Sequence, residues 1–202
     1  MKIGSKYKIA RRLGAPIFEK TQTAKFRAKA EAKEGTTKRG KAKSDYARQL
    51  IEKQKARLTY GISEKQFSRY VRTVIESQSN TPLQHIFEKL ETRLDNVVAR
   101  LGLVPTRRFA RQAVSHGHII VNGKKMTIPS YVVRPGDVIS IREGSKANGI
   151  FKEFDEKVKT LETPIWMTWN VEKKQASILR MPSLEGQDLL FDLSVVLEYY
   201  KR

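Results

Sequence analysis

Three arginines on one expected helix have the chemistry to bind an anion. The helix should begin after the capping residue Thr106 and end near Gly117. It carries Arg107, Arg108 and Arg111, and each guanidinium can donate two parallel hydrogen bonds to the non-bridging oxygens of a phosphate. This clustering predicts that the helix binds a polyanion.

Two lysines beside a turn extend this prediction. Asn122-Gly123 separates two short apolar runs, a pattern typical of a β-hairpin with a two-residue loop. Lys124 and Lys125 follow the turn and should therefore stand at an exposed tip. A strand at 138–142 should complete a compact module that begins near residue 92.

His116 and His118 are residues of a type that binds metals or acts in catalysis. No third ligand or carboxylate partner lies close to them in the sequence, and a zinc site needs at least three protein ligands. The chain has no cysteine, which excludes Fe–S clusters, Cys-ligated zinc and thiol catalysis. We expect no metal site, and two interpretations of the histidines stay open: structural residues or contacts to RNA.

Motifs that mark enzymes are absent from the sequence. It has no Gly-rich phosphate loop, no nucleophile elbow, no zinc-protease motif and no acidic cluster suited to Mg²⁺. The two basic segments hold few carboxylates, and none is paired with another in a way that suits acid–base catalysis. We therefore expect a protein that is not an enzyme and that needs no cofactor.

Positive charge is concentrated in two parts of the chain. The 202 residues include 40 Lys+Arg and 21 Asp+Glu, for a net charge of +19. The net charge is +13 over residues 1–57, zero over 58–91, +7 over 92–142 and −1 over 143–202. Such segments attract polyanions, because neutralising phosphates releases counterions. Acidic membrane lipids and evenly solvated charge are the alternatives, but charge needed only for solubility has no reason to segregate in this way.

The sequence has neither a secretory signal nor a membrane span. Its basic N-terminus lacks the apolar run of a signal peptide, and no stretch approaches the eighteen or so apolar residues of a spanning helix. A soluble, cytoplasmic protein without a membrane partner is expected.

Residues 1–43 are predicted to be an extended basic arm. They contain few large apolar residues, without a sustained period, and so should not bury enough surface to offset the entropy of ordering. We expect the arm to order on a polyanion, with phosphate contacts from Arg11, Arg12, Lys38, Arg39, Lys41 and Lys43.

Three helices should follow the arm. Ser44, Ser63 and Thr81 are good capping residues, each followed by apolar residues at helical spacing. The apolar spacing after Thr81 continues to Leu101, which predicts one uninterrupted rod into the central module. Cations on two flanks of the first of these helices are Arg48, Lys53, Lys55 and Arg57.

The last third of the chain has a balanced charge and more apolar residues. A short helix is expected over 150–161, followed by a β-hairpin over 165–181. The apolar tail over 192–200 should form a closing helix that packs against the first helices.

Several stretches together carry a resemblance to a known family. The central stretches closely resemble the RNA-binding domain named after bacterial ribosomal protein S-four, and they are RLDNVV (93–98), PTRR (105–108), ARQAVSHGHIIVNGKK (110–125), IPSY (128–131) and PGDVISI (135–141). Two further stretches resemble the ribosomal protein family itself, and they are SDYARQLIEKQK (44–55) and YGISEKQF (60–67). An RNA-modifying enzyme or synthetase fragment would need a catalytic domain in addition. A stand-alone regulatory RNA binder would not need the helices of 44–91.

The resemblance implies an α+β fold with several parts. A mainly helical domain over 44–91, completed by about 182–202, would carry an inserted RNA-binding domain over 92–155, in which two helices pack on a short antiparallel sheet. The basic arm would cover 1–43, and a short helix and hairpin would cover 156–181.

The resemblance also implies a function and partners. Members of the family are primary binders of 16S rRNA that nucleate assembly of the body of the small ribosomal subunit in the cytoplasm. They contact ribosomal proteins S-five and S-twelve, with an effect on translational accuracy, and they help to line the path by which mRNA enters the subunit. The expected RNA-binding residues are Arg11, Arg12, Lys41, Lys43, Tyr46, Arg48, Lys53, Lys55, Arg57, Arg93, Arg107, Arg108, Arg111, His116, His118, Lys124 and Lys125.

Two departures from the family pattern concern the arm. Many relatives carry a zinc-binding cysteine cluster there, whereas this chain has no cysteine and is expected to be metal-free. Relatives also commonly have a PGQHG motif before the first long helix, where this chain has EGTTKRG (34–40). The path of the arm on RNA is therefore the feature of the family that can least be carried over to this chain.

Overall fold

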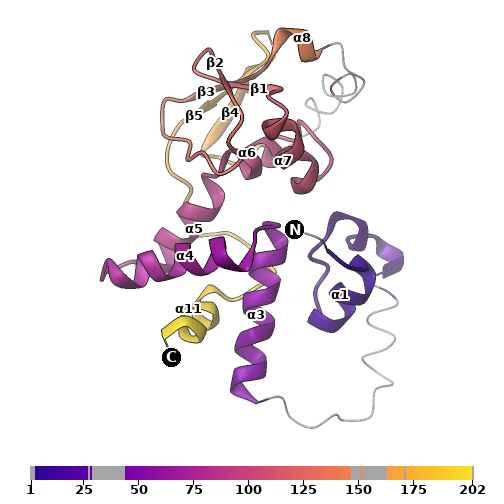
Figure 1. Ribbon diagram of the computed structural model, residues 1–202, viewed down its shortest axis with the longest axis vertical. Helices are drawn as coiled ribbons and strands as arrows, with labels where there is room; N and C mark the ends of the chain where they lie inside the picture. The colour runs from indigo at the N-terminus through magenta and orange to yellow at the C-terminus, as the bar shows by residue number, and fades with distance from the viewer. Residues whose placement is uncertain are drawn as a thin grey trace. The chain divides into compact units, whose positions relative to one another are not determined.

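The computed structural model describes residues 3–26, 28, 44–146, 151, 163–170 and 172–201. The chain divides into two compact units. Met1–Ile86 and Gly186–Arg202 form the helical unit, and Phe87–Glu185 form the α/β unit (Figure 1). No helix among the described residues is both long enough and apolar enough to cross a membrane.

The beginning of the chain is folded, so the expectation of an extended arm was wrong for its first part. Helix α1 (Lys6–Leu13) ends at Gly14, whose φ of 68° turns the chain back, and the 3-10 helix η1 (Glu19–Thr21) follows. This left-handed turn favours glycine, because it has no Cβ. The reversal gathers apolar residues that have no sequence period into one cluster, which contains Ala10, Leu13, Ala15, Ile17, Phe18 and, from farther along the chain, Leu58.

The helical unit contains two further long helices, α3 (Asp45–Thr59) and α4 (Glu64–Glu76). The next helix, α5 (Pro82–Glu91), begins in this unit and ends in the α/β unit. The hydroxyl of Ser44 accepts from the Ala47 amide at 3.3 Å and that of Ser63 accepts from the Gln66 amide at 3.3 Å, so both expected caps are confirmed.

The C-terminal helix completes this unit. Helix α11 (Leu193–Lys201) packs against α3 and α4, as its apolar sequence predicted. Gln49 of α3 donates to Glu198 at 3.3 Å, and the Tyr200 hydroxyl donates to Glu64 of α4 at 2.8 Å. Residues about 150 positions apart in the sequence are thus joined by direct hydrogen bonds.

The expected rod from Thr81 to Leu101 is broken. Helix α5 ends at Glu91 and α6 (Leu94–Arg100) begins three residues later. Between them Arg93 is extended, with φ −65° and ψ 133°, and forms a β-bridge with Val132. The amide of Val133 donates to the Thr92 carbonyl at 2.9 Å, so a distant loop provides partners for the backbone where the helix is interrupted.

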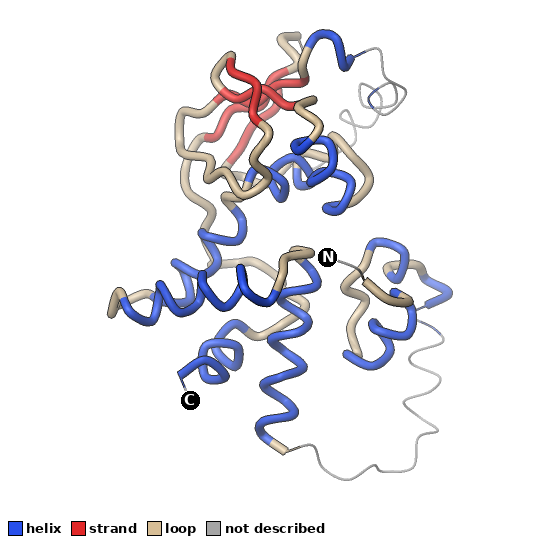
Figure 2. Tube along the Cα trace, in the orientation of Figure 1, coloured by secondary structure: helices blue, strands red, loops and turns tan. Residues whose placement is uncertain are grey.

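The α/β unit is built on a five-stranded antiparallel sheet (Figure 2). Its strands are β1 (Ile119–Val121), β2 (Lys124–Met126), β3 (Val138–Ile141), β4 (Met167–Asn170) and β5 (Gln175–Ile178), in the order β2-β1-β3-β5-β4. Val121, Ile139, Ala176 and Trp169 are register partners across four strands. The alternating apolar residues therefore form rows on one face, where they can be buried together.

Two helices cover the buried face of the sheet. Helices α6 and α7 (Arg107–Ser115) contribute Leu94, Val97, Ala110 and Val114 to the same core as the strands. A short helix, α8 (Glu143–Lys146), follows β3. The expected hairpin in the last third exists, and β5 joins it to β3, a pairing that the sequence did not indicate. Most of the helix expected over 150–161 lies outside the described residues.

Glu64 links three elements of the helical unit. Its carboxylate accepts from Lys53 of α3 at 3.0 Å and from Tyr200 of α11 at 2.8 Å. Burial raises the pKa of this carboxyl, but hydrogen bonds from Lys53 and Tyr200 and the charges of Lys53 and Arg57 outweigh burial, so the pKa lies below the ordinary 4.5. Burial and the hydrogen bond to Glu64 raise the pKa of the Tyr200 hydroxyl.

We predict that Glu64→Gln lowers the stability of the helical unit at neutral pH. A carboxyl whose pKa is lowered by folding stabilises the fold above its ordinary pKa, and this contribution is lost as the pH falls through the folded-state value. The difference from the unaltered protein should therefore shrink as the pH falls below 4.5. Urea unfolding followed by the circular dichroism of the tyrosines measures the stability of the helical unit, because all tyrosines except Tyr131 belong to this unit.

The control for this experiment is Glu76→Gln, on the same helix. Glu76 is exposed and forms no ion pair with a described residue, so its replacement should leave the stability nearly unchanged at every pH. A Glu64→Gln effect of constant size from neutral to acid pH would contradict the prediction.

Candidate nucleic-acid interface

Helix α7 separates its apolar and polar residues onto two faces. Thr106 caps the helix by accepting from the Phe109 amide at 3.2 Å, as expected. Ala110, Ala113 and Val114 are buried against the sheet. Arg108 and His116 are exposed on the other side, so this face of α7 is available to a ligand.

The hairpin after α7 adds two lysines. Asn122 and Gly123 have φ values of 49° and 77°, the left-handed conformations of a tight two-residue turn, and the expected hairpin is confirmed. Lys124 and Lys125 are both exposed. The side chain of Lys125 lies over Gly117, where an added Cβ would overlap its Cε atom.

Four of the exposed residues of this region are basic or can carry a positive charge, and we call them the hairpin surface: Arg108, His116, Lys124 and Lys125. Gly117 directly follows His116 and the end of α7, so the contact of Lys125 with Gly117 places the β2 lysine beside this helix end. The lysine stem can cover this backbone while its ammonium stays in water.

Two of the three α7 arginines are held by carboxamide or carboxylate groups of α6. Arg107 donates from Nε to Asn96 Oδ1 at 2.9 Å. Arg111 donates from Nε and Nη2 to Asp95 Oδ2, at 3.0 and 2.8 Å, and its side chain remains 31% exposed. These guanidiniums fix α7 against α6, and contact with RNA by their exposed parts stays a prediction.

Arg93 is a structural residue rather than a surface contact. Its side chain is 1% exposed and donates from Nε and Nη2 to both Asp95 oxygens, at 3.0 and 2.7 Å. A buried guanidinium that is paired with both carboxylate oxygens cannot reach a phosphate outside the protein. We therefore withdraw Arg93 from the expected RNA contacts.

A second buried network lies beside the first. Glu91, at the end of α5, is 1% exposed and accepts from Arg100 at 2.8 and 3.1 Å and from Asn96 Nδ2 at 2.8 Å. Asn96 then accepts from Arg107. The networks centred on Asp95 and Glu91 together hold the interrupted α5–α6 segment and the first turns of α7.

The two histidines of the α/β unit differ in environment. His118 Nδ1 lies 2.9 Å from the Ser145 hydroxyl, and its ring meets the edge of Phe151 at 6.1 Å between centroids. His118 is thus held among protein groups, whereas His116 is exposed. Within the described ranges, no group of three His, Cys, Asp or Glu side chains is placed to hold a metal ion.

The cations expected on α3 are mostly engaged inside the helical unit. Lys53 is 5% exposed, with its ammonium 3.0 Å from Glu64 and 4.4 Å from the centre of the Tyr199 ring. Lys55 pairs with Glu52 at 2.7 Å, and Arg57 lies 3.4 Å from Glu64. The burial of Lys53 removes it from the expected RNA contacts.

The other expected residues of the helical unit face solvent or fall outside the description. Arg48 is exposed, and Tyr46 is 51% exposed with its ring 5.8 Å from that of Tyr199. Arg11 and Arg12 are exposed in the last turn of α1. The remaining expected contacts of the arm lie outside the described residues, and they are Lys38, Arg39, Lys41 and Lys43.

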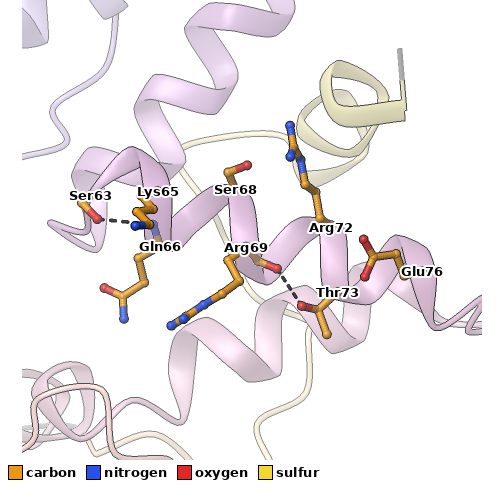
Figure 3. Close-up of a pocket in the computed structure, with 8 residues that line it drawn as sticks. All are labelled: Ser63, Lys65, Gln66, Ser68, Arg69, Arg72, Thr73 and Glu76. Atoms are coloured by element: carbon orange, nitrogen blue, oxygen red, sulfur yellow. Dashed lines mark hydrogen bonds between the residues drawn. The ribbon is translucent and has the colours of Figure 1, made fainter.

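Helix α4 carries a cationic face that the sequence reasoning missed. Lys65, Arg69 and Arg72 border a shallow hollow of about 470 Å³ on this helix, together with Gln66 and Thr73, and we call these three cations the α4 face. In Figure 3, Arg69 and Arg72 leave the helix in different directions. None of the three forms an ion pair with a described residue.

The neutral charge of segment 58–91 concealed this face. Of its acids, Glu64 is bound to Lys53 and Glu91 is buried against Arg100. Two of the four acids of this segment are therefore neutralised by cations of other segments, whereas Lys65, Arg69 and Arg72 of α4, together with Glu76, face the hollow. The spacing of Lys65, Arg69 and Arg72 on one helix was the signal that could have revealed it.

We predict that Asp95→Ala destabilises the α/β unit by about 3–5 kcal/mol, because it leaves Arg93 buried without a counter-charge. Denaturant unfolding followed by tryptophan fluorescence measures this unit, since both tryptophans, Trp166 and Trp169, lie in it. Glu172→Ala removes an exposed acid from the same unit and should have little effect. Equal effects of the two substitutions would show that the Asp95 network is unimportant.

Comparison with known proteins identifies the family. Residues 1–91 match the family model described as the ribosomal protein S4/S9 N-terminal domain, and residues 92–139 match that of the S4 domain. A relative from Ligilactobacillus salivarius, the small ribosomal subunit protein uS4, is 41% identical over 98% of both chains. The uS4 protein of Aquifex aeolicus is 39% identical over 99% of this chain and 98% of its own. That of Halothermothrix orenii is 44% identical over 79% of this chain and 76% of its own.

The first two of these relatives match nearly the whole chain, which confirms the resemblance read from the central motifs and the first helices. The uS4 family is structural, so the expectation of a non-enzyme is also confirmed. The chain belongs to the uS4 family of small ribosomal subunit proteins.

Proposed function

We propose that this protein is a structural constituent of the small ribosomal subunit that binds 16S rRNA. The observation that carries the proposal is the division of its cations into two classes. Lys53 and Arg93 are buried against carboxylates, whereas the hairpin surface presents Arg108, Lys124 and Lys125 to solvent. The second class is suited to the phosphates of RNA, and the family places such a protein in the subunit.

The rigid support of the hairpin surface favours binding to folded RNA. Lys124 and Lys125 lie in a strand paired with β1, and β1 is paired with β3 in the sheet. Arg108 projects from a helix that the Asp95 and Glu91 networks hold in place. The backbone that carries these cations is fixed by sheet and helix and loses little conformational freedom on binding, so the spacing of the cations suits a phosphate pattern of fixed geometry.

The α4 face supplies a second binding region in the other unit. Its two arginines point in different directions, which suits contacts with separate phosphates. Gln66 and Thr73 add polar side chains of the kind that bind phosphate and sugar oxygens. Two regions on two units would let one protein bind more than one segment of rRNA.

The finer parts of the proposal rest on the family resemblance. We infer that the protein binds early in assembly and nucleates the body of the subunit in the cytoplasm. Contacts with ribosomal proteins S-five and S-twelve, an effect on translational accuracy, and proximity to mRNA as it enters the subunit belong to the same inference. The names of the relatives, small ribosomal subunit protein uS4, support the location in this subunit.

We predict that Arg108→Ala with Lys124→Ala weakens binding to protein-free 16S rRNA and reduces the slope of log affinity against log salt by about 1–2. The slope should fall because two phosphate contacts are lost. Titrations at several salt concentrations measure both quantities. Lys173→Ala with Lys201→Ala removes the same charge from exposed positions elsewhere and should leave the slope unchanged. A similar loss of slope in both variants would indicate a response to net charge alone.

A second prediction concerns α4. Lys65→Gln with Arg69→Gln and Arg72→Gln should reduce the salt slope by about 2–3 while preserving the helix, because glutamine is a good helix former. Circular dichroism verifies the helix and the same titration measures the slope. An unchanged slope would remove the α4 face from the interface without affecting the proposal for the hairpin surface.

A further inference from the structure

Asn122 at the tip of the first hairpin belongs to a dipeptide with its own chemistry. In an Asn-Gly sequence the backbone nitrogen of the glycine can attack the side-chain carbonyl carbon of the asparagine. Gly123 has no neighbouring atoms where a Cβ would stand, so nothing around the glycine hinders the reaction. Asn122 is also exposed, so water can reach the product.

The reaction is deamidation, and it needs water alone as co-reactant. A bond forms between the Gly123 nitrogen and Asn122 Cγ, the bond from Cγ to Nδ2 breaks, and ammonia leaves with the proton lost by Gly123. Water then adds to one of the two carbonyls of the resulting succinimide. The products are aspartate or isoaspartate at position 122.

The structure holds the amide of Asn122 by both of its polar atoms. Asn122 Nδ2 donates to Asp137 Oδ1 at 2.7 Å, and Asn122 Oδ1 accepts from the Val138 amide at 2.8 Å. The other oxygen of Asp137 accepts from the Arg134 amide at 2.8 Å, which fixes the carboxylate. Attack at Cγ makes this carbon tetrahedral and displaces both amide atoms, so both hydrogen bonds must be given up.

We propose that Asn122 is a deamidation site and that its hydrogen bonds to Asp137 and Val138 restrain the reaction in the folded protein. Deamidation therefore requires that the contact between the hairpin tip and the start of β3 opens, because this opening exposes the amide to attack. This inference concerns the stability of the hairpin to chemical change and is independent of which polyanion the hairpin surface binds.

Deamidation would alter the hairpin surface in three ways. Aspartate at position 122 would place a second carboxylate against Asp137, where the amide had been a donor, and like charges at that distance repel. It would also put a negative charge two residues from Lys124. Isoaspartate would lengthen the backbone at a two-residue turn that sets the register of β1 and β2.

The chain provides an internal reference for a test, because Asn148-Gly149 is a second Asn-Gly pair. The full-length protein is incubated at neutral pH in buffer and in concentrated urea, and peptide mass spectrometry measures deamidation at both asparagines. In urea the two should react at similar rates. In buffer Asn122 should react severalfold more slowly than it does in urea. Equal rates for Asn122 in buffer and in urea would overturn the proposal.

Variants then test the restraint itself. Asp137→Ala should accelerate deamidation of Asn122 severalfold in buffer, and Glu172→Ala, which removes an exposed acid of the same unit, should leave the rate unchanged. Tryptophan fluorescence confirms that the α/β unit is folded in both variants. An unchanged rate at Asn122 in Asp137→Ala, or an equal acceleration at Asn148, would contradict a restraint that acts on Asn122 through Asp137.

Discussion

The carboxylate of Asp95 is the group on which the α/β unit depends. It is 4% exposed and accepts hydrogen bonds from Arg93 and Arg111. Arg93 is buried because the chain is extended at this point and pairs with Val132, and a buried guanidinium requires a partner of opposite charge. Through Arg111 the same carboxylate also fixes α7, so it helps to decide which side of that helix faces solvent.

A similar arrangement holds the helical unit together. Glu64 accepts from Lys53 and Tyr200 and thereby joins α3, α4 and α11. In both units a few acids neutralise internal cations, which leaves other cations exposed. The lysines and arginines therefore fall into two groups, those in internal ion pairs and those that give the surface its positive charge. Net charge along the sequence does not distinguish these groups, which is why the α4 face was missed.

Local patterns predicted much of the secondary structure. The caps at Ser44, Ser63 and Thr106 and the hairpin at Asn122-Gly123 depend on hydrogen bonds between near neighbours, which a sequence displays directly. The prediction of one uninterrupted helix through Arg93 was wrong, because the backbone of Arg93 pairs with Val132 of a distant loop. The folded start of the chain was missed because its apolar residues converge through the turn at Gly14 and have no period.

The sequence by itself determined the family, the α+β class, the basic surfaces in outline and the absence of thiol chemistry, because these follow from composition, spacing and short-range motifs. The tertiary structure decided which cations are available. Arg93, Lys53 and Arg108 are all cations in basic segments of the chain, yet the first two are buried and the third is exposed. The physical reason is that burial and pairing join residues from different elements, such as Lys53 with Tyr199, and no local pattern records those contacts.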